Sequence, residues 1–145
     1  ESALAIMPQL AGFVPMLTGT GGNCGSQSST LVIRGLAVGE IEFRDLLKVI
    51  WKEIRIAVCI SIVLAVVNGL RIMLMGQGDA LMAFTIGLTM ACTVVIAKVV
   101  GCTLPLIAKR VGLDPAIMAT PLISTLVDIS TISVYFAIVS AVFQL

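Results

Sequence analysis

The sequence predicts an all-α protein, a polytopic transmembrane helical bundle with four spans in this chain plus an interfacial amphipathic helix. Three observations lead to this class. Of the 145 residues, 59% are hydrophobic and only 12% are charged, whereas soluble domains carry about 25% charged residues. The mean hydropathy is +1.13. Apolar segments recur along the chain at about the 20-residue length that a membrane-crossing helix requires.

The first predicted span covers residues 2–33. It carries Pro8, Pro15 and a cluster of glycines in its middle, and prolines and glycines are usual causes of a kink. We therefore expect a bent or interrupted helix. Residues 35–55 hold most of the charge, while apolar residues recur among them at three- and four-residue spacing. This pattern predicts an amphipathic helix on the membrane surface, with its charged face in solvent.

The second and third spans are predicted at residues 56–75 and 80–100. Only residues 76–79 separate them, which indicates a tight helical hairpin. Gly101 and Pro105 are expected to break the stretch that follows, because proline cannot donate a helix hydrogen bond and glycine is a poor helix former.

The last span is predicted at residues 116–143. The stretch before it contains Gly112, followed by Asp114 and Pro115. Aspartate is favoured at the N-cap of a helix and proline at its first position. We therefore expect the last span to begin directly after Asp114.

The polar stretch at residues 15–34 lies at membrane depth in this scheme. Such backbone survives in a bilayer only where it is buried in protein or lines a water-filled cavity. For Gly21, Gly22 and Gly25 a structural role suffices, since small residues allow membrane helices to approach closely. Asn23 and Gln27 lie one helical turn apart, and packing alone does not require two amides. We expect them to line an aqueous pathway.

Asp128 lies near the middle of the last span, where a carboxylate costs roughly 2.5–3.5 kcal/mol. At helical spacing it shares a face with hydroxyl groups. The residues on that face are Thr120, Ser124, Thr131 and Tyr135. Carboxylate and hydroxyl oxygens suit hard cations such as Mg²⁺, Ca²⁺ or Mn²⁺. The sequence therefore predicts a cation site at Asp128, with Ser124, the neighbouring Thr125 and the other threonines of this face along a pore.

Structural alternatives exist for these polar residues. Asp128 could pair with Arg71 or Lys98, or stay protonated and hydrogen-bonded between helices. Both basic residues lie near predicted span ends, however, and can extend to the interface. The threonine line at 85, 89 and 93 is interpreted as structural, because membrane threonines commonly bond to their own helix.

Composition excludes several classes of function. The chain has no histidine, and its four cysteines form no C-x-x-C pair, so zinc, iron–sulfur and redox sites have no support. It has no basic tract that could follow nucleic-acid phosphates. No Ser-Lys or paired-aspartate arrangement points to an intramembrane enzyme.

Basic residues predict the orientation of the chain. Eight of the nine lie toward one side, and Arg71 alone falls near the other, so the first side is cytoplasmic. Four spans then place both ends outside. Because the chain begins with Glu1 and residues 3–17 lack the positive start of a signal peptide, we expect a fragment or a processed protein.

Four motifs, read in order, carry a family resemblance: G-G-N-C-G-S-Q, R-G-L-A-V-G-E, P-L-I-A-K-R-V-G-L-D-P-A and P-L-I-S-T-L-V-D-I-S. Together they resemble the membrane domain of MgtE-type magnesium channels. The resemblance covers essentially the whole chain and implies a homodimer of five-span subunits with a cation pathway between them. Residues 1–145 would then be the transmembrane ion-conducting domain from span two to span five, without the first span and the cytosolic regulatory domain.

The resemblance also implies roles for individual residues. Asp128 matches the central ion-recognition residue, Asp114 lies at the cytoplasmic mouth, and Asn23 lines the pathway near its inner constriction. Thr120 departs from the pattern, since an asparagine is expected there, so the constriction would be lined differently.

These observations combine into a functional hypothesis. Hydrated Mg²⁺, with Mn²⁺ or Ca²⁺ as alternatives at the same site, passes into the cytoplasm of a bacterium through a pore at a homodimer interface in the cell membrane. The membrane potential drives it. Two other classes stay open: a Na⁺- or H⁺-coupled divalent cation transporter, and a structural membrane subunit. The lipid bilayer is the expected environment, and no nucleic-acid partner is expected.

Overall fold

The computed structural model describes residues 8–118 and 120–143, without the side chains at positions 118 and 120. Within these ranges the chain is helical and contains no strand. Its elements are α2 (Val14–Ala37), η1 (Phe43–Asp45), α3 (Leu46–Leu74), α4 (Ala80–Arg110), η2 (Pro115–Met118) and α5 (Thr120–Phe143). The predicted all-α class is confirmed.

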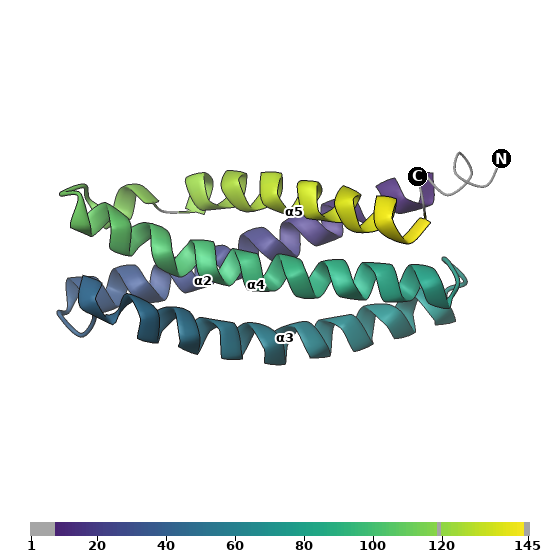
Figure 1. Cartoon of the computed structure of the whole chain (residues 1–145), viewed down its shortest axis with the longest axis horizontal. Coiled ribbons are helices and arrows are strands. Elements are labelled where there is room, and N and C mark those ends of the chain that lie inside the picture. Colours follow the sequence, from purple (N-terminus) through teal and green to yellow (C-terminus); the bar gives the residue numbers. More distant parts are fainter. Residues whose placement is uncertain (1–7, 119, 144–145) are drawn as a thin grey trace.

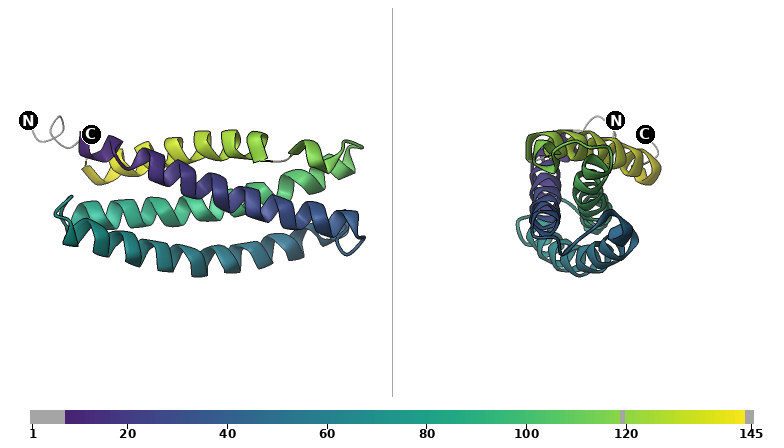
Figure 2. Two further views of the ribbon diagram at one scale, coloured as in Figure 1. Left: turned by 180° about the vertical axis from the view of Figure 1, so that it is seen from behind. Right: turned by 90° about the vertical axis from the view of Figure 1, so that its left-hand side faces the viewer.

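The four long helices run side by side along one axis (Figure 1). α4 is the central helix and contacts α2, α3 and α5, while α2 also packs on α5. The view along the bundle shows α3 on one side of α2 and α4, and α5 on the other (Figure 2). The first described residues and the end of α5 lie at the end of the bundle where α3 turns into α4 (Figure 1).

Three helical segments of the described chain are long and apolar enough to cross a membrane. They are Phe43–Leu74, Ala80–Arg110 and Pro121–Phe143. α2 is not among them, so length and composition support three of the four predicted spans. α3 has a broad exposed apolar surface, as expected for a helix that faces lipid. Its large exposed apolar residues include Val58, Ile62, Val63, Val66, Val67 and Leu70.

The first predicted span is interrupted, as expected, but the break expected at the glycine cluster is not there. α2 is a continuous helix of 24 residues that contains the whole cluster, and the chain turns earlier, at residues 12–13, after a short helical segment at 8–11. The glycines leave the helix intact because neighbouring helices pack against them, as described below. Packing of this kind outweighs the intrinsic cost of glycine in a helix, about 1 kcal/mol each.

Two other predicted boundaries are also wrong. Residues 46–55 of the charged segment and the second span form one helix, α3, because no glycine or proline separates them. The helical segment that leads into α3 begins after Glu42. There the Glu42 amide donates to Asp45 Oδ2 at 3.2 Å. α4 continues through Gly101 and Pro105 to Arg110. It ends where Gly112 adopts a φ of 81°, which is a left-handed conformation that favours glycine.

Asp114 caps a different helix from the one predicted. Its Oδ1 accepts a hydrogen bond from the Ala116 amide at 2.9 Å, so it caps the short helix η2 rather than α5. η2 and position 119 separate this turn from the last span.

The core lies where α2, α4 and α5 meet. Its fully buried side chains include Leu17, Ile86, Met90, Val94, Ile123 and Val127. Near the end of α5, the hydroxyl of buried Tyr135 donates to the carbonyl oxygen of Leu10 at 2.7 Å. This bond ties α5 to the short helical segment at residues 8–11, which precedes α2.

Candidate cation site

An open groove between α2 and α5 brings together three of the predicted polar site residues. Asn23 comes from α2, and Ser124 and Asp128 come from α5. The groove has a volume of about 350 Å³ and is lined by Pro15, Thr18, Gly19, Gly22, Asn23, Ser26, Ser124 and Asp128. Its polar lining is therefore made of carboxylate, amide and hydroxyl groups, which offer the oxygen ligands that Mg²⁺ and Ca²⁺ prefer.

The groove adjoins a second concave surface on α2. This surface, about 580 Å³ in volume, is lined by Asn23, Ser26, Gln27, Thr30 and Leu31. Asn23 and Ser26 belong to both surfaces, so they form one polar strip along the exposed side of α2. The opposite side of the helix carries small and apolar residues and is buried in the bundle.

The glycines of α2 allow α5 to approach closely. A Cβ atom at Gly21 would lie 2.8 Å from Val127 Cγ1, and one at Gly25 would lie 2.9 Å from Ile123 Cγ2. At Gly22 an added Cβ would lie 3.5 Å from Ser124 Oγ. Any side chain at the first two positions would push α5 outward, so these glycines place Asp128 beside α2.

Asp128 is partly exposed in the groove. No described residue forms a hydrogen bond or an ion pair with it. The two basic residues that could have paired with Asp128 have other partners. Lys98 Nζ lies 3.3 Å from Glu53 Oε2, and Arg71 donates to Gln77 Oε1 at 3.1 Å. Among the described residues, the carboxylate therefore has no fixed cation.

The remaining predicted residues lie elsewhere. Thr131 is buried next to Gly21 rather than in the groove, and exposed Thr125 donates to its own helix, at the Pro121 carbonyl, at 2.9 Å. The side chain of Thr120 lies outside the described residues.

Asp114 and Asp128 line different pockets. Asp114 belongs to a small pocket that it shares with Ile33, Leu36, Ala37, Lys109 and Pro115. The structure therefore does not bring the two predicted metal ligands together within one chain.

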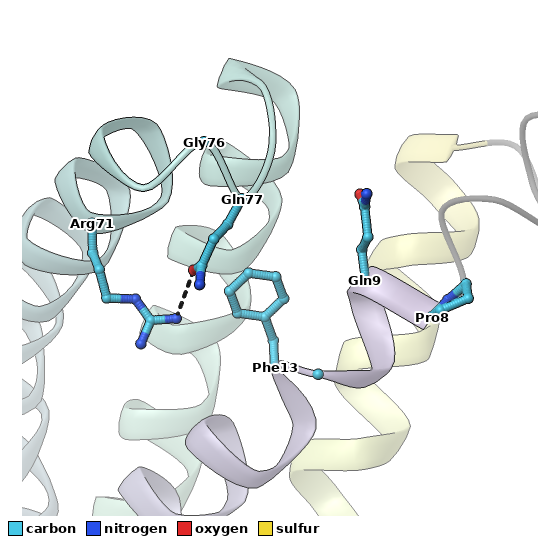
Figure 3. A pocket seen from close by; sticks show the side chains of 7 residues that line it. Pro8, Gln9, Phe13, Arg71, Gly76 and Gln77 are labelled. Atoms are coloured by element: carbon cyan, nitrogen blue, oxygen red, sulfur yellow. Dashed lines mark hydrogen bonds between the residues drawn. The ribbon is translucent and has the colours of Figure 1, made fainter.

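A separate pocket lies at the end of the bundle where α3 turns into α4 (Figure 3). Its volume is about 330 Å³, and it is lined by Pro8, Gln9, Gly12, Phe13, Arg71, Gly76 and Gln77. Arg71 and Gln77 point toward one another beside Phe13, and the guanidinium lies 6.0 Å from the centroid of that ring. With an arginine and no acid in its lining, this pocket does not suit a cation.

Sequence reasoning missed a buried polar cluster. Glu53, interpreted as part of a solvated face, is only 3% exposed, and so is Lys98. The available signal was Lys98 itself, because a lysine within a long apolar helix needs a partner. The structural interpretation of the threonine line is confirmed at two positions, since Thr85 donates to Leu81 O at 2.8 Å and Thr89 to Thr85 O at 2.9 Å.

Comparison with known families matches residues 14–138 to the MgtE family, described as a divalent cation transporter. The chain belongs to this family. The family is thus one of transporters rather than of enzymes, and the resemblance carried by the sequence motifs is confirmed.

Three bacterial relatives, each named magnesium transporter MgtE, show how far the similarity extends. The relative from Thermus thermophilus is 35% identical over 95% of this chain. Those from Bacillus subtilis and Enterococcus faecalis are 36% and 33% identical over 97%. The chain spans only 30–31% of the length of these relatives. Together with three helical segments that are long and apolar enough to cross a membrane, membership of the family identifies a multi-pass protein of a bacterial cell membrane.

Proposed function

We propose that this chain is the ion-conducting membrane domain of a magnesium channel, which moves hydrated Mg²⁺ into the cytoplasm through a pore between two copies of the chain. The observation that carries the proposal is the groove, in which Asp128 lies beside Asn23 and Ser124 without a protein cation. The relatives named as magnesium transporters support Mg²⁺ as the transported ion.

The chemistry of Mg²⁺ explains why one carboxylate in each chain suffices. Mg²⁺ dehydrates reluctantly, keeps several waters and commonly uses one or two carboxylates. Asp128 and the oxygens of Asn23 and Ser124 would hold its water shell through hydrogen bonds. Two Asp128 side chains facing one another would repel, and a bound cation removes that repulsion. Mn²⁺ and Ca²⁺, which also take oxygen ligands, would compete at the same place.

The polar strip on α2 supports a homodimer. Asn23, Gln27 and Thr30 are exposed on the outer side of a single bundle, and polar groups of this kind do not face lipid. A water-filled interface between two copies gives them a suitable environment. α2 would be the fourth span, because 24 residues extend roughly 36 Å and the hydrocarbon core is about 30 Å thick.

The membrane potential would drive the ion inward. Each elementary charge gains about 2.3 kcal/mol per 100 mV, and a divalent ion gains about twice that. Asp114 lies at the end of the bundle that carries most of the basic residues, which is the cytoplasmic end by the positive-inside rule. There it would attract ions at the inner mouth.

The experiment is Mg²⁺ uptake in a bacterial strain that requires Mg²⁺, with Ca²⁺ and Mn²⁺ as competitors. It compares the protein as its gene encodes it with Asp128→Asn and with Glu40→Gln, an exposed acid away from the groove. At matched membrane levels, uptake should collapse or lose selectivity only in Asp128→Asn. Unchanged uptake in that variant would favour a structural role. Mg²⁺ currents that require a Na⁺ or H⁺ gradient would favour coupled transport over a channel.

A further inference from the structure

Three buried polar side chains from three helices meet on the side of α2 away from the groove. Ser28 of α2 donates to Glu53 Oε2 of α3 at 2.5 Å, and Lys98 Nζ of α4 lies 3.3 Å from the same oxygen. Their exposed fractions are 0%, 3% and 3%. We call Ser28, Glu53 and Lys98 the interhelical cluster. Because each partner belongs to a different helix, the cluster fixes three helices relative to one another.

The cluster does not have the character of a second cation site. Lys98 already supplies the positive charge that a metal ion would bring, and its ammonium is attached to α4. A metal ion would have to displace it from Glu53 and leave a charged lysine buried without a partner, which is costly. The cluster therefore holds the three helices in position and does not bind an ion.

The position of α2 at Ser28 determines the position of the groove. Ser28 lies five residues after Asn23 on a continuous helix, a distance of roughly 7.5 Å along the axis. Close to Ser28, α2 and α4 touch without intervening side chains, because a Cβ atom at Gly101 would overlap the carbonyl oxygen of Gly25. A rotation of α2 that breaks the cluster would also move Asn23 relative to Asp128.

Selectivity is the property most sensitive to such a movement. Mg²⁺ demands near-ideal octahedral geometry, whereas Ca²⁺ accepts flexible coordination. A groove whose walls shift slightly should lose its preference for the hydrated Mg²⁺ ion before it loses conduction.

We propose that the interhelical cluster is a positioning device for the cation pathway: Glu53, Lys98 and Ser28 set the selectivity for Mg²⁺ over Ca²⁺ without touching the ion. This proposal rests on the proposed transport function. It assigns Glu53 and Lys98 an effect on transport that is transmitted through α2.

The test measures the ratio of Mg²⁺ to Ca²⁺ uptake per molecule in the membrane, for Glu53→Gln, Lys98→Met and the exchanged pair Glu53→Lys/Lys98→Glu. Lys48→Met is the matched control, because Lys48 pairs with Asp45 at 3.2 Å on the exposed surface. We expect the two single variants to lower the ratio about two- to thirtyfold, the range that a coupling of about 0.5–2 kcal/mol produces. The exchanged pair should recover part of the loss, and the control should match the wild type.

A purely structural role predicts a different outcome. It would reduce the amount of protein in the membrane but leave the uptake ratio per molecule unchanged, and that result overturns the proposal. If the charge variants fail to reach the membrane, Ser28→Ala keeps the ion pair and removes only the link to α2. A wild-type ratio in Ser28→Ala would equally overturn the proposal. Asp128→Asn, measured in parallel, separates this failure from a failure of the transport function itself.

Discussion

Asp128 and Glu53 are both acids within long apolar helices, yet their surroundings differ. Glu53 is buried and paired, with Lys98 Nζ 3.3 Å away and the Ser28 hydroxyl at 2.5 Å. Asp128 is partly exposed in a groove, and no described residue pairs with it. We infer that a membrane carboxylate with its own lysine holds helices together, and we propose that one without a protein partner binds an ion from outside.

The largest expected effect concerns the paired acid. Lys98→Met leaves the Glu53 carboxylate buried without its cation, which should lower the free energy of unfolding by about 3–5 kcal/mol. Lys48→Met breaks an exposed pair and should cost at most about 1 kcal/mol. Denaturation of the purified protein in lipid–detergent mixtures measures both. Equal losses in the two variants would mean that the buried pair contributes no more to stability than an exposed pair. Glu53 would then have no special structural role to set against that of Asp128.

The next effect concerns the unpaired acid and its ion. Mg²⁺ at one hundred times its dissociation constant should raise the free energy of unfolding of the wild-type protein by about 2.7 kcal/mol. The reason is that a ligand which binds only the folded state shifts the folding equilibrium toward that state. Asp128→Asn should abolish this gain, while Glu40→Gln should keep it. Thermal unfolding with and without Mg²⁺ gives the result. Full stabilisation of Asp128→Asn by Mg²⁺ would place the ion elsewhere.

A smaller effect sharpens the description of Glu53. Ser28→Ala removes one hydrogen bond to a charged group, which typically contributes about 1.5–3 kcal/mol. Ser133→Ala is the matched control, since exposed Ser133 donates only to its own helix, at the Ile129 carbonyl. Equilibrium unfolding should show a loss in the first variant and almost none in the second. Similar values for both would mean that Ser28 does not hold Glu53.

The smallest effect is expected at Asp128 in the absence of divalent cations. Asp128→Asn should then lower the free energy of unfolding by no more than about 0.5 kcal/mol, because it breaks no contact with a described residue and removes the repulsion between two facing carboxylates. The same denaturation measurement, made in chelator, tests this expectation. A loss comparable to that of Lys98→Met would reveal a structural partner for Asp128.

The sequence was sufficient for the features that depend on local pattern. Helical spacing placed Ser124 and Asp128 on one face of α5, and the amides of α2 identified the strip that carries Asn23. These predictions used neighbours within one helix, where geometry is fixed by the 3.6-residue period. That the polar faces of α2 and α5 meet in one groove did not follow from the spacing within either helix.

The features that depend on distant contacts could not be predicted. Glu53 and Lys98 lie 45 residues apart, and a run of charges around Glu53 has the pattern of a solvated face. The glycines of α2 favour a break on intrinsic propensity, whereas contacts with α5 keep the helix continuous. Gly101 and Pro105 were expected to break the stretch after residue 100, but α4 continues through both. In each case tertiary packing outweighed a local preference.

The bond between Tyr135 and Leu10 connects the groove with the beginning of the described chain. Tyr135 lies seven residues after Asp128 on α5, about 10 Å along the axis, and its hydroxyl is anchored to the Leu10 carbonyl at 2.7 Å. A twist of α5 that moves Asp128 must therefore break this bond or carry the short helical segment at residues 8–11 with it. If Asp128 binds the ion as proposed, we expect a movement of α5 on ion binding to reach residues 8–11 through Tyr135.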